Sequence, residues 1–287
     1  MLLLLLTIIS FSSDALVLKW QFKQNDTFRY ETTSRLTQSV RVKEQEYKQD
    51  NVHIAVMKYT VQSVEADGSL KLEQIIESMK ATNPDGSASP GNNAIYNQLQ
   101  GVALTMKLNP KFEVTELEGY DLLLKKLAGD DPSLRRVVHA LFSEEHFKQA
   151  VHQAFGVVPQ KEVPAGFQWN RKSETSIGPL GSVQVNLQMT AVGMKDFESK
   201  KLVKITYKPT LVYHPATSEA SNPEMSITKG TVQLQESDGI AYFDPKAGRL
   251  YHSTLKLKMT GELTGKISGQ EVPIRFDQTQ TIEMRIK

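Results

Sequence analysis

Apolar and polar side chains alternate with a period of two residues along most of this 287-residue chain. The alternation is clear over 183–191, and again in the series Ile274, Phe276, Gln278, Gln280, Ile282, Met284 and Ile286. Successive side chains of a β-strand point to opposite faces, so these runs predict strands with one buried and one solvated face. Most of the chain is therefore expected to form antiparallel sheet.

The strand-like runs fall into two groups on either side of residues 119–156. In the first group, alternation begins at Leu16 and continues through Phe22, and further runs precede residue 118. In the second group, strands are predicted over roughly 167–177, 182–193, 201–213, 225–237, 239–243, 249–263 and 271–286. This organisation predicts one β-rich domain over 16–287, with sheet halves at 16–118 and 167–287.

Between the two halves, over 119–156, the apolar period changes to that of α-helices. A first helix is expected to end at Gly129. Asp131 then precedes Pro132, which is typical of an N-cap followed by the first helical turn. Ser143 is the expected cap of a third helix, which ends near Gly156. The sequence therefore predicts three short helices between the sheet halves.

Turn residues give two further predictions in the first half. Asp67-Gly68 lies between alternating runs, and this dipeptide is a strong signal for a hairpin with a type I′ turn. Residues 83–93 concentrate proline, glycine and small polar residues, which indicates a mobile loop.

Two stretches of the chain resemble each other weakly. Residues 101–114 contain the turn Asn109-Pro110-Lys111, and residues 239–250 contain Asp244-Pro245-Lys246. Asn or Asp followed by proline is common in type I turns. The similarity is consistent with a duplication of the sheet half, and equally with two hairpins that use the same common turn.

The first fifteen residues resemble a secretory signal peptide. Leu2–Ile9 is apolar apart from Thr7, and Ser13-Asp14-Ala15 fits a small-x-small cleavage site. The initiator amine supplies the only positive charge, so an uncleaved anchor and a misplaced start codon are the alternatives. A membrane-spanning helix needs about 20 apolar residues, and no segment meets this requirement. We expect an exported protein, periplasmic or extracellular, that is not an integral membrane protein.

Composition excludes several function classes. The chain has no cysteine, which removes disulfides, thiolate nucleophiles and cysteine zinc sites. Lysine and arginine number 34 against 32 aspartates and glutamates, and the signs are interspersed. This balance provides no positive field to hold nucleic acid. An exported chain without cysteine fits a bacterial envelope.

A set of short motifs resembles a family of exported bacterial domains of unknown function. They are Trp20-Gln21-Phe22, Phe28-Arg29-Tyr30, Tyr59-Thr60-Val61, Asp67-Gly68, Asn109-Pro110-Lys111 and Asp244-Pro245-Lys246-Ala247-Gly248-Arg249-Leu250. The strand order is also similar to the half-barrels of periplasmic lipoprotein carriers. The resemblance implies an α+β fold with a curved, half-barrel-like antiparallel sheet and the helical segment packed on it.

No catalytic or cofactor signature is present. No two of the six histidines form the H-E-x-x-H zinc pattern, and Gly178-Pro179-Leu180-Gly181-Ser182 lacks the spacing of a nucleophile elbow. Gly261–Lys266 has three residues between its glycines, whereas a phosphate-binding loop needs four. We therefore predict no catalytic residue, no metal and no cofactor, and favour a non-enzymatic protein. An unrecognised hydrolase is kept as an alternative to the two binding hypotheses given below.

The apolar surface between sheet and helices is the candidate site. Its predicted ligand-binding residues are Trp20, Phe28, Tyr30, Phe147, Val151 and Phe155. Aromatic side chains line many apolar pockets, but the same residues are typical of a closed core. The leading hypothesis is an envelope protein that binds an apolar small molecule or lipid. The competing hypothesis is a structural or protein-interaction module with a solid core and an envelope protein as partner.

Overall fold

The computed structural model describes residues 15–141, 143–176, 181–215, 225–267 and 270–287. The predicted leader, over 1–15, lies outside these residues except for Ala15. The described helices are α1 (Pro90–Leu99), α2 (Tyr120–Ala128), α3 (Pro132–Leu141) and α4 (Glu144–Phe155). The described strands are β1 (Leu16–Leu18), β2 (Thr27–Val42), β3 (Gln45–Val64), β4 (Leu70–Thr82), β5 (Ala103–Leu108), β6 (Val114–Glu118), β7 (Lys161–Val163), β8 (Gln168–Ser176), β9 (Ser182–Phe197), β10 (Lys200–His214), β11 (Met225–Asp244), β12 (Arg249–Ile267) and β13 (Gln270–Ile286).

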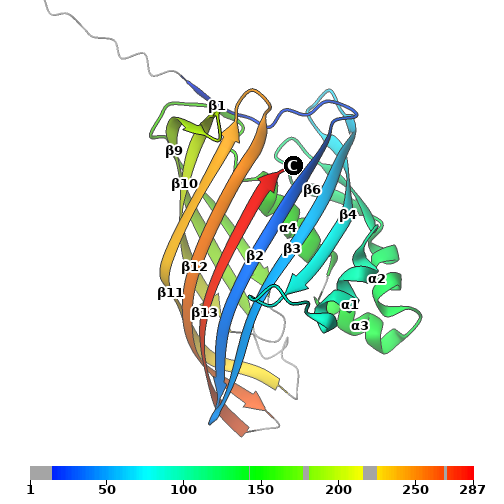
Figure 1. The fold of residues 1–287 in the computed structure, drawn as a ribbon, viewed down its shortest axis with the longest axis vertical. Helices are drawn as coiled ribbons and strands as arrows, with labels where there is room; N and C mark the ends of the chain where they lie inside the picture. The colour runs from blue at the N-terminus through cyan, green and yellow to red at the C-terminus, as the bar shows by residue number, and fades with distance from the viewer. Residues whose placement is uncertain (1–14, 142, 177–180, 216–224, 268–269) are drawn as a thin grey trace, which may run out of the picture.

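One large antiparallel sheet contains eleven of these described strands, in the order β6-β5-β4-β3-β2-β13-β12-β11-β10-β9-β8. Each half of the chain forms a meander, and the two meanders join where β2 pairs with β13 in the centre. The sheet curves strongly, as Figure 1 shows. The prediction of a mostly antiparallel curved sheet with helices between two sheet-rich segments is confirmed.

The helices occupy two places on this sheet. Helix α4 contacts both edge strands, β6 and β8, and lies on the inner side of the curve (Figure 1). Helices α1, α2 and α3 lie together beside β4. We call the side of the sheet that α4 contacts the inner face. The end of the sheet near α4 is its upper part, and the end far from α4 is its lower part, as drawn in Figure 1.

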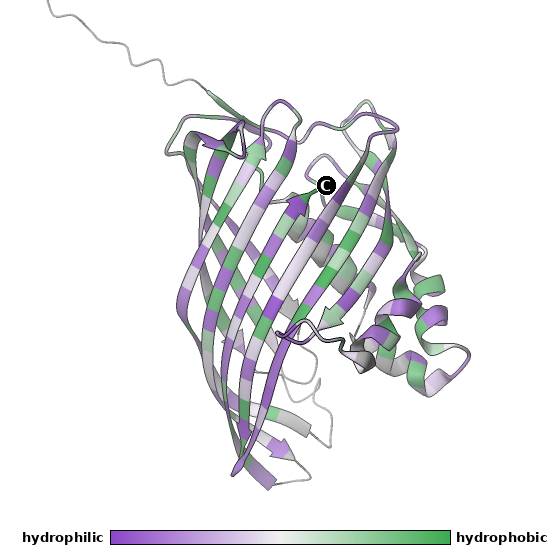
Figure 2. Cartoon of the chain, in the orientation of Figure 1, coloured by the Kyte–Doolittle hydropathy of each residue, from purple (hydrophilic) through white to green (hydrophobic). Residues whose placement is uncertain are grey.

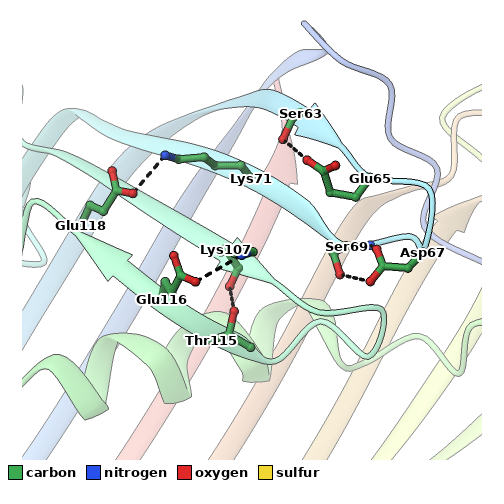
Figure 3. Close-up of polar contacts among 9 residues, drawn as sticks. All are labelled: Ser63, Glu65, Asp67, Ser69, Lys71, Lys107, Thr115, Glu116 and Glu118. Atoms are coloured by element: carbon green, nitrogen blue, oxygen red, sulfur yellow. Dashed lines mark hydrogen bonds and ion pairs between the residues drawn. The ribbon is translucent and has the colours of Figure 1, made fainter.

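Side chains divide between the two faces as the alternation predicts, and Figure 2 shows the resulting bands along each strand. Phe28 and Tyr30 of β2 are buried on the inner face, whereas Arg29 between them pairs with Glu77 on the outer face. On the outer face of β4, β5 and β6, Lys71 pairs with Glu118 at 3.0 Å and Lys107 pairs with Glu116 at 3.2 Å (Figure 3). The inner face therefore holds the core and the outer face is solvated.

The hairpin predicted at Asp67-Gly68 connects β3 and β4 (Figure 3), but its turn differs from the prediction. Positive φ falls on Gly68, at +88°, and not on Asp67. The Gly68 N–H donates to the Glu65 carbonyl at 3.0 Å, and the Glu65 N–H donates to the Ser69 carbonyl at 2.7 Å. This is a three-residue loop that ends in a left-handed glycine, rather than a type I′ turn.

The loop predicted over 83–93 was wrong from Pro90 onward, where α1 begins. Proline suits the first helical position because its φ is already helical and its missing N–H is not needed there. Asn93 then fixes the helix to β4: its Oδ1 accepts from the Ala81 N–H at 2.7 Å and its Nδ2 donates to the Ala81 carbonyl at 3.0 Å. Composition suggested a loop because proline and asparagine are also common in turns.

The first strand is shorter than its alternation predicts. Strand β1 ends at Leu18 and pairs with β7, and residues 19–26 cross the upper part of the molecule without strand structure. We call residues 19–26 the strap. The rings of Trp20 and Phe22 in the strap lie in the core.

Asp131 caps α3 as predicted, because its Oδ1 accepts from the N–H groups of Ser133 and Leu134 at 2.7 and 3.1 Å.

Candidate ligand-binding cavity

Five of the six predicted site residues meet in the upper part of the inner face. Trp20, Phe28, Tyr30, Val151 and Phe155 belong to one buried cluster, which we call the aromatic core. The Trp20 and Phe155 ring centroids lie 5.3 Å apart, and Trp20 Nε1 donates to the Phe155 carbonyl at 2.6 Å. Tyr30 donates its hydroxyl to the Leu250 carbonyl at 3.0 Å, and burial raises its pKa. These side chains pack on one another.

Phe147, the sixth predicted residue, lies elsewhere. It packs against Tyr120 with ring centroids 6.2 Å apart, in a second cluster formed by α1–α3 with β4 and β5. The structure therefore brings five of the predicted residues together and separates the sixth. Ligand binding by these six residues stays a prediction.

Polar anchors close the aromatic core from two sides. Arg249 pairs with Asp26 of the strap at 2.8 Å and lies over the Phe22 ring, 4.2 Å from its centroid. On the other side, Arg171 of β8 donates to the His152 carbonyl in the last turn of α4, where the helix dipole favours a positive charge. Burial lowers the pKa of Arg171 to about 10. These contacts hold the strap and α4 on the inner face.

The lower part of the inner face, which α4 does not reach, contains a cavity of about 490 Å³. Six described strands line it, β2 and β9–β13. The lining side chains are Gln38, Val40, Val42, Val183, Val185, Leu211, Tyr213, Ile227, Val232, Leu257, Met259, Leu263, Ile274, Phe276 and Gln278. None of these described lining residues is charged. We call this space the lower cavity.

Strand register brings the lining residues together across the sheet. Val40 of β2 is opposite Phe276 of β13, and Phe276 is opposite Gly261 of β12. On the facing wall, Val185 of β9 is opposite Leu211 of β10. Each strand contributes every second residue to the inner face, so each set of paired strands presents an apolar wall. Among the described residues, β10 pairs with β11 only over Val203–Tyr207, so β9 and β10 form one wall of the lower cavity and β2, β13, β12 and β11 form the other.

The sequence pattern did not predict the lower cavity as a binding site, although its residues lie in the alternating runs described above. Ile274 and Phe276 belong to the same series as Met284 and Ile286, which pack against the aromatic core. Alternation identifies the buried face of a strand, but not which part of that face another element covers. The polar residues Gln278 and Gln280, which interrupt the series, are the available signal that its two ends differ.

Among the described residues, no three His, Asp or Glu side chains lie close enough together to hold a metal ion. None of the described helices combines the length and apolar character that crossing a membrane requires.

The chain therefore forms a curved, half-barrel-like antiparallel sheet whose inner face is mostly apolar. The chain belongs to the family described as "Family of unknown function (DUF6263)", whose model matches residues 53–271. The resemblance to a domain family of unknown function is thus confirmed. No curated protein matches the chain in sequence.

The solved structures that match this chain share little sequence with it. A structure titled "Lipid-protein interactions in lipovitellin" has 8% identity and a TM-score of 0.40, and covers 93% of this chain, which spans only 26% of the lipovitellin chain. A DUF1329 family protein from Desulfovibrio piger has 8% identity and a TM-score of 0.15, over 86% of this chain and 83% of its own. A putative outer membrane lipoprotein-sorting protein domain from Vibrio parahaemolyticus has 9% identity, a TM-score of 0.15 and the same coverage.

Proposed function

We propose that this protein is an exported, non-enzymatic binding protein of the cell envelope that holds one apolar or lipid-like ligand in the lower cavity. The observation that carries the proposal is the cavity itself. Its volume of about 490 Å³ lies within the range of about 300–1,000 Å³ that is typical of small-molecule sites. Its lining is apolar apart from two glutamine amides and one phenol.

The position of the cavity favours binding. Each of its walls consists of strands with hydrogen-bonded backbones, β2 with β13 and β12 on one side and β9 with β10 on the other, so each wall is formed before a ligand enters and little ordering cost follows. Each Å² of apolar ligand surface removed from water contributes about 25 cal/mol. The proposed site lies beyond the helices, rather than between the sheet and the helices where the sequence placed it.

A structural or protein-interaction module is the competing function, and one observation supports it. Among the described residues, β4 pairs with β3 only from Val52 to Val64, so Gln45–Asn51 present an unpaired strand edge. Exposed edges bind peptides by strand addition. However, this edge carries Glu46, Lys48 and Asp50, and charged side chains commonly protect edges from pairing. The apolar cavity is therefore the better supported site.

Native mass spectrometry of the full chain, purified without detergent and then mixed with a lipid panel, tests the proposal. We expect a lipid adduct. Leu257→Trp adds a bulky ring to the cavity wall and should weaken uptake by about tenfold or more, equivalent to about 1.4 kcal/mol. Leu122→Trp is the matched control because Leu122 is 67% exposed on α2. A bare polypeptide mass and no uptake by the parent chain would reject ligand binding and favour the interaction module.

A further inference from the structure

The lower cavity has two amide side chains in an otherwise apolar wall. Gln38 of β2 and Gln278 of β13 are directly opposite each other in the sheet, and both point to the inner face. Gln38 Nε2 donates to Gln278 Oε1 at 3.0 Å. The pair therefore lies across the central strand junction of the protein, where the two meanders meet.

A second polar contact continues this feature toward the aromatic core. Gln280 Nε2 donates to Ser34 Oγ at 3.3 Å, again between β13 and β2. We call Ser34, Gln38, Gln278 and Gln280 the amide belt. On β13 the belt separates the cavity residues Ile274 and Phe276 from Ile282, Met284 and Ile286, so the apolar lining that this strand contributes ends at polar side chains.

The belt has hydrogen-bonding capacity beyond these contacts. A glutamine amide carries two N–H donors and a carbonyl with two lone pairs. The single bond between Gln38 and Gln278 therefore leaves the pair able to donate to one ligand group and to accept from another. Hydroxyl, ester and amide groups match this capacity.

Charged ligand groups fit the same wall poorly. None of the described lining residues is a lysine, arginine or histidine. An ionised carboxylate or phosphate at the belt would lose its hydration without a countercharge, which is strongly unfavourable. The inner-face cation of β8, Arg171, is opposite Leu187, beyond Val185 at the cavity wall, and binds the carbonyl of His152. The charge distribution therefore favours a neutral group.

We infer that the amide belt binds an uncharged hydrogen-bonding group of the ligand, and that Gln38 and Gln278 select neutral lipids, such as long-chain alcohols, esters and amides, against fatty acids. This inference rests on the proposed function and names its ligand class. The register and the hydrogen bond between the two glutamines carry it.

Three probes with the same alkyl chain test the selectivity: palmityl alcohol, palmitamide and palmitic acid, with hexadecane as an apolar reference. Titration of the full chain at neutral pH should show the alcohol and the amide binding about tenfold or more tightly than the acid. Acidification that protonates palmitic acid should reduce this difference, because the neutral carboxyl group can hydrogen-bond to the belt. The affinity for the alcohol should change little over the same pH interval.

The double variant Gln38→Leu with Gln278→Leu tests the residues. Replacing both hydrogen-bonding partners by apolar groups of similar size has little effect on stability, so the variant should fold. Its affinity for the alcohol and the amide should fall about tenfold, to that for hexadecane, while hexadecane binding is retained. Thr37→Val with Thr279→Val is the matched control, since these residues are the neighbouring opposite pair and lie on the outer face.

The outcomes separate the inference from the function. Binding of none of the four probes would overturn both. Equal binding of all four, unaffected by the double leucine variant, would overturn the inference and leave the apolar site standing. Tighter binding of palmitic acid than of the alcohol would also overturn it, because a cation such as Arg171 would then determine the ligand class.

Discussion

The ring of Phe276 on β13 lies over the α-carbon of Gly261 on β12, and the two residues are opposite each other on the inner face. A Cβ atom on Gly261 would overlap the ring. Gly239 of β11 and Tyr207 of β10 have the same arrangement. Glycine in a strand interior lets the neighbouring ring lie flat against the backbone and marks tight bends of a sheet. These pairs explain how large aromatic side chains fit inside so curved a sheet.

Gly261→Ala should displace the Phe276 ring into the lower cavity. Overpacking of this kind typically costs about 1–3 kcal/mol, so the free energy of unfolding should fall by that amount in urea denaturation. Lipid uptake should weaken as well, because Phe276 lines the cavity. Gly91→Ala is the control: it lies in α1 with open space around it, and the change should stabilise by up to about 1 kcal/mol. A Gly261→Ala protein as stable as the parent would contradict the packing described here.

Arg249 should contribute measurably to stability through the strap. Arg249→Met removes a charged hydrogen bond to Asp26 and the stacking on Phe22, and a loss of about 1.5–3 kcal/mol is expected. Lys71→Met breaks the outer pair with Glu118, whose side chains are 40% and 60% exposed, and should cost less than about 1 kcal/mol.

A double-mutant cycle isolates the interaction between the strap and β12. Asp26→Asn alone leaves the buried Arg249 without its ionic partner, so the double variant should cost less than the sum of the single variants. Strict additivity, measured by urea denaturation, would show that the two residues act independently.

Much of the fold was predictable because its strands have one buried face. The alternation over 183–191 lies in β9, and the helical period over 119–156 corresponds to α2, α3 and α4. The break predicted near Asp238-Gly239 was wrong, since β11 runs through it. Gly239 is there to accommodate the Tyr207 ring, and a sequence does not distinguish a glycine in a turn from a glycine under a ring.

The site was less predictable because it depends on where distant elements meet. Phe28 and Val40 lie on the same face of the same strand, but the aromatic core covers Phe28 and the lower cavity exposes Val40. The difference arises from the position of α4, whose packing against β6 and β8 is a property of the assembled sheet. A period-two pattern contains no information on how far along a strand a helix will lie.

Acidification should destabilise the protein in part through His53. Tyr96 of α1 contacts its Nδ1 at 2.7 Å, and burial lowers the pKa of His53 below the ordinary value of 6.5. The unfolded chain then binds more protons than the folded chain between the two values, so the free energy of unfolding falls as the pH drops below 6.5 through the folded pKa.

His53→Gln should reduce this acid sensitivity. The glutamine retains a polar partner for Tyr96 and does not titrate, so the loss of stability as the pH falls below 6.5 should be smaller than in the parent. Tyr96→Phe keeps the imidazole and should keep the pH dependence. Urea denaturation at a series of pH values measures both. The same pH dependence in His53→Gln and the parent would assign the effect to other groups, among them His152, whose pKa burial also lowers.

The two parts of the inner face should respond differently to the same increase in volume. Val185 and Ala191 lie on the inner face of the same strand, β9, but Val185 lines the lower cavity whereas Ala191 is fully buried in the aromatic core. Val185→Phe places its ring in open space and should lower the free energy of unfolding by less than about 1 kcal/mol. Ala191→Phe should lower it by about 3 kcal/mol or more, because a packed interior accommodates added carbon only by distortion. Equal destabilisation of the two variants would mean that the lower part is as tightly packed as the upper part, and a solid sheet interior would leave no room for a ligand.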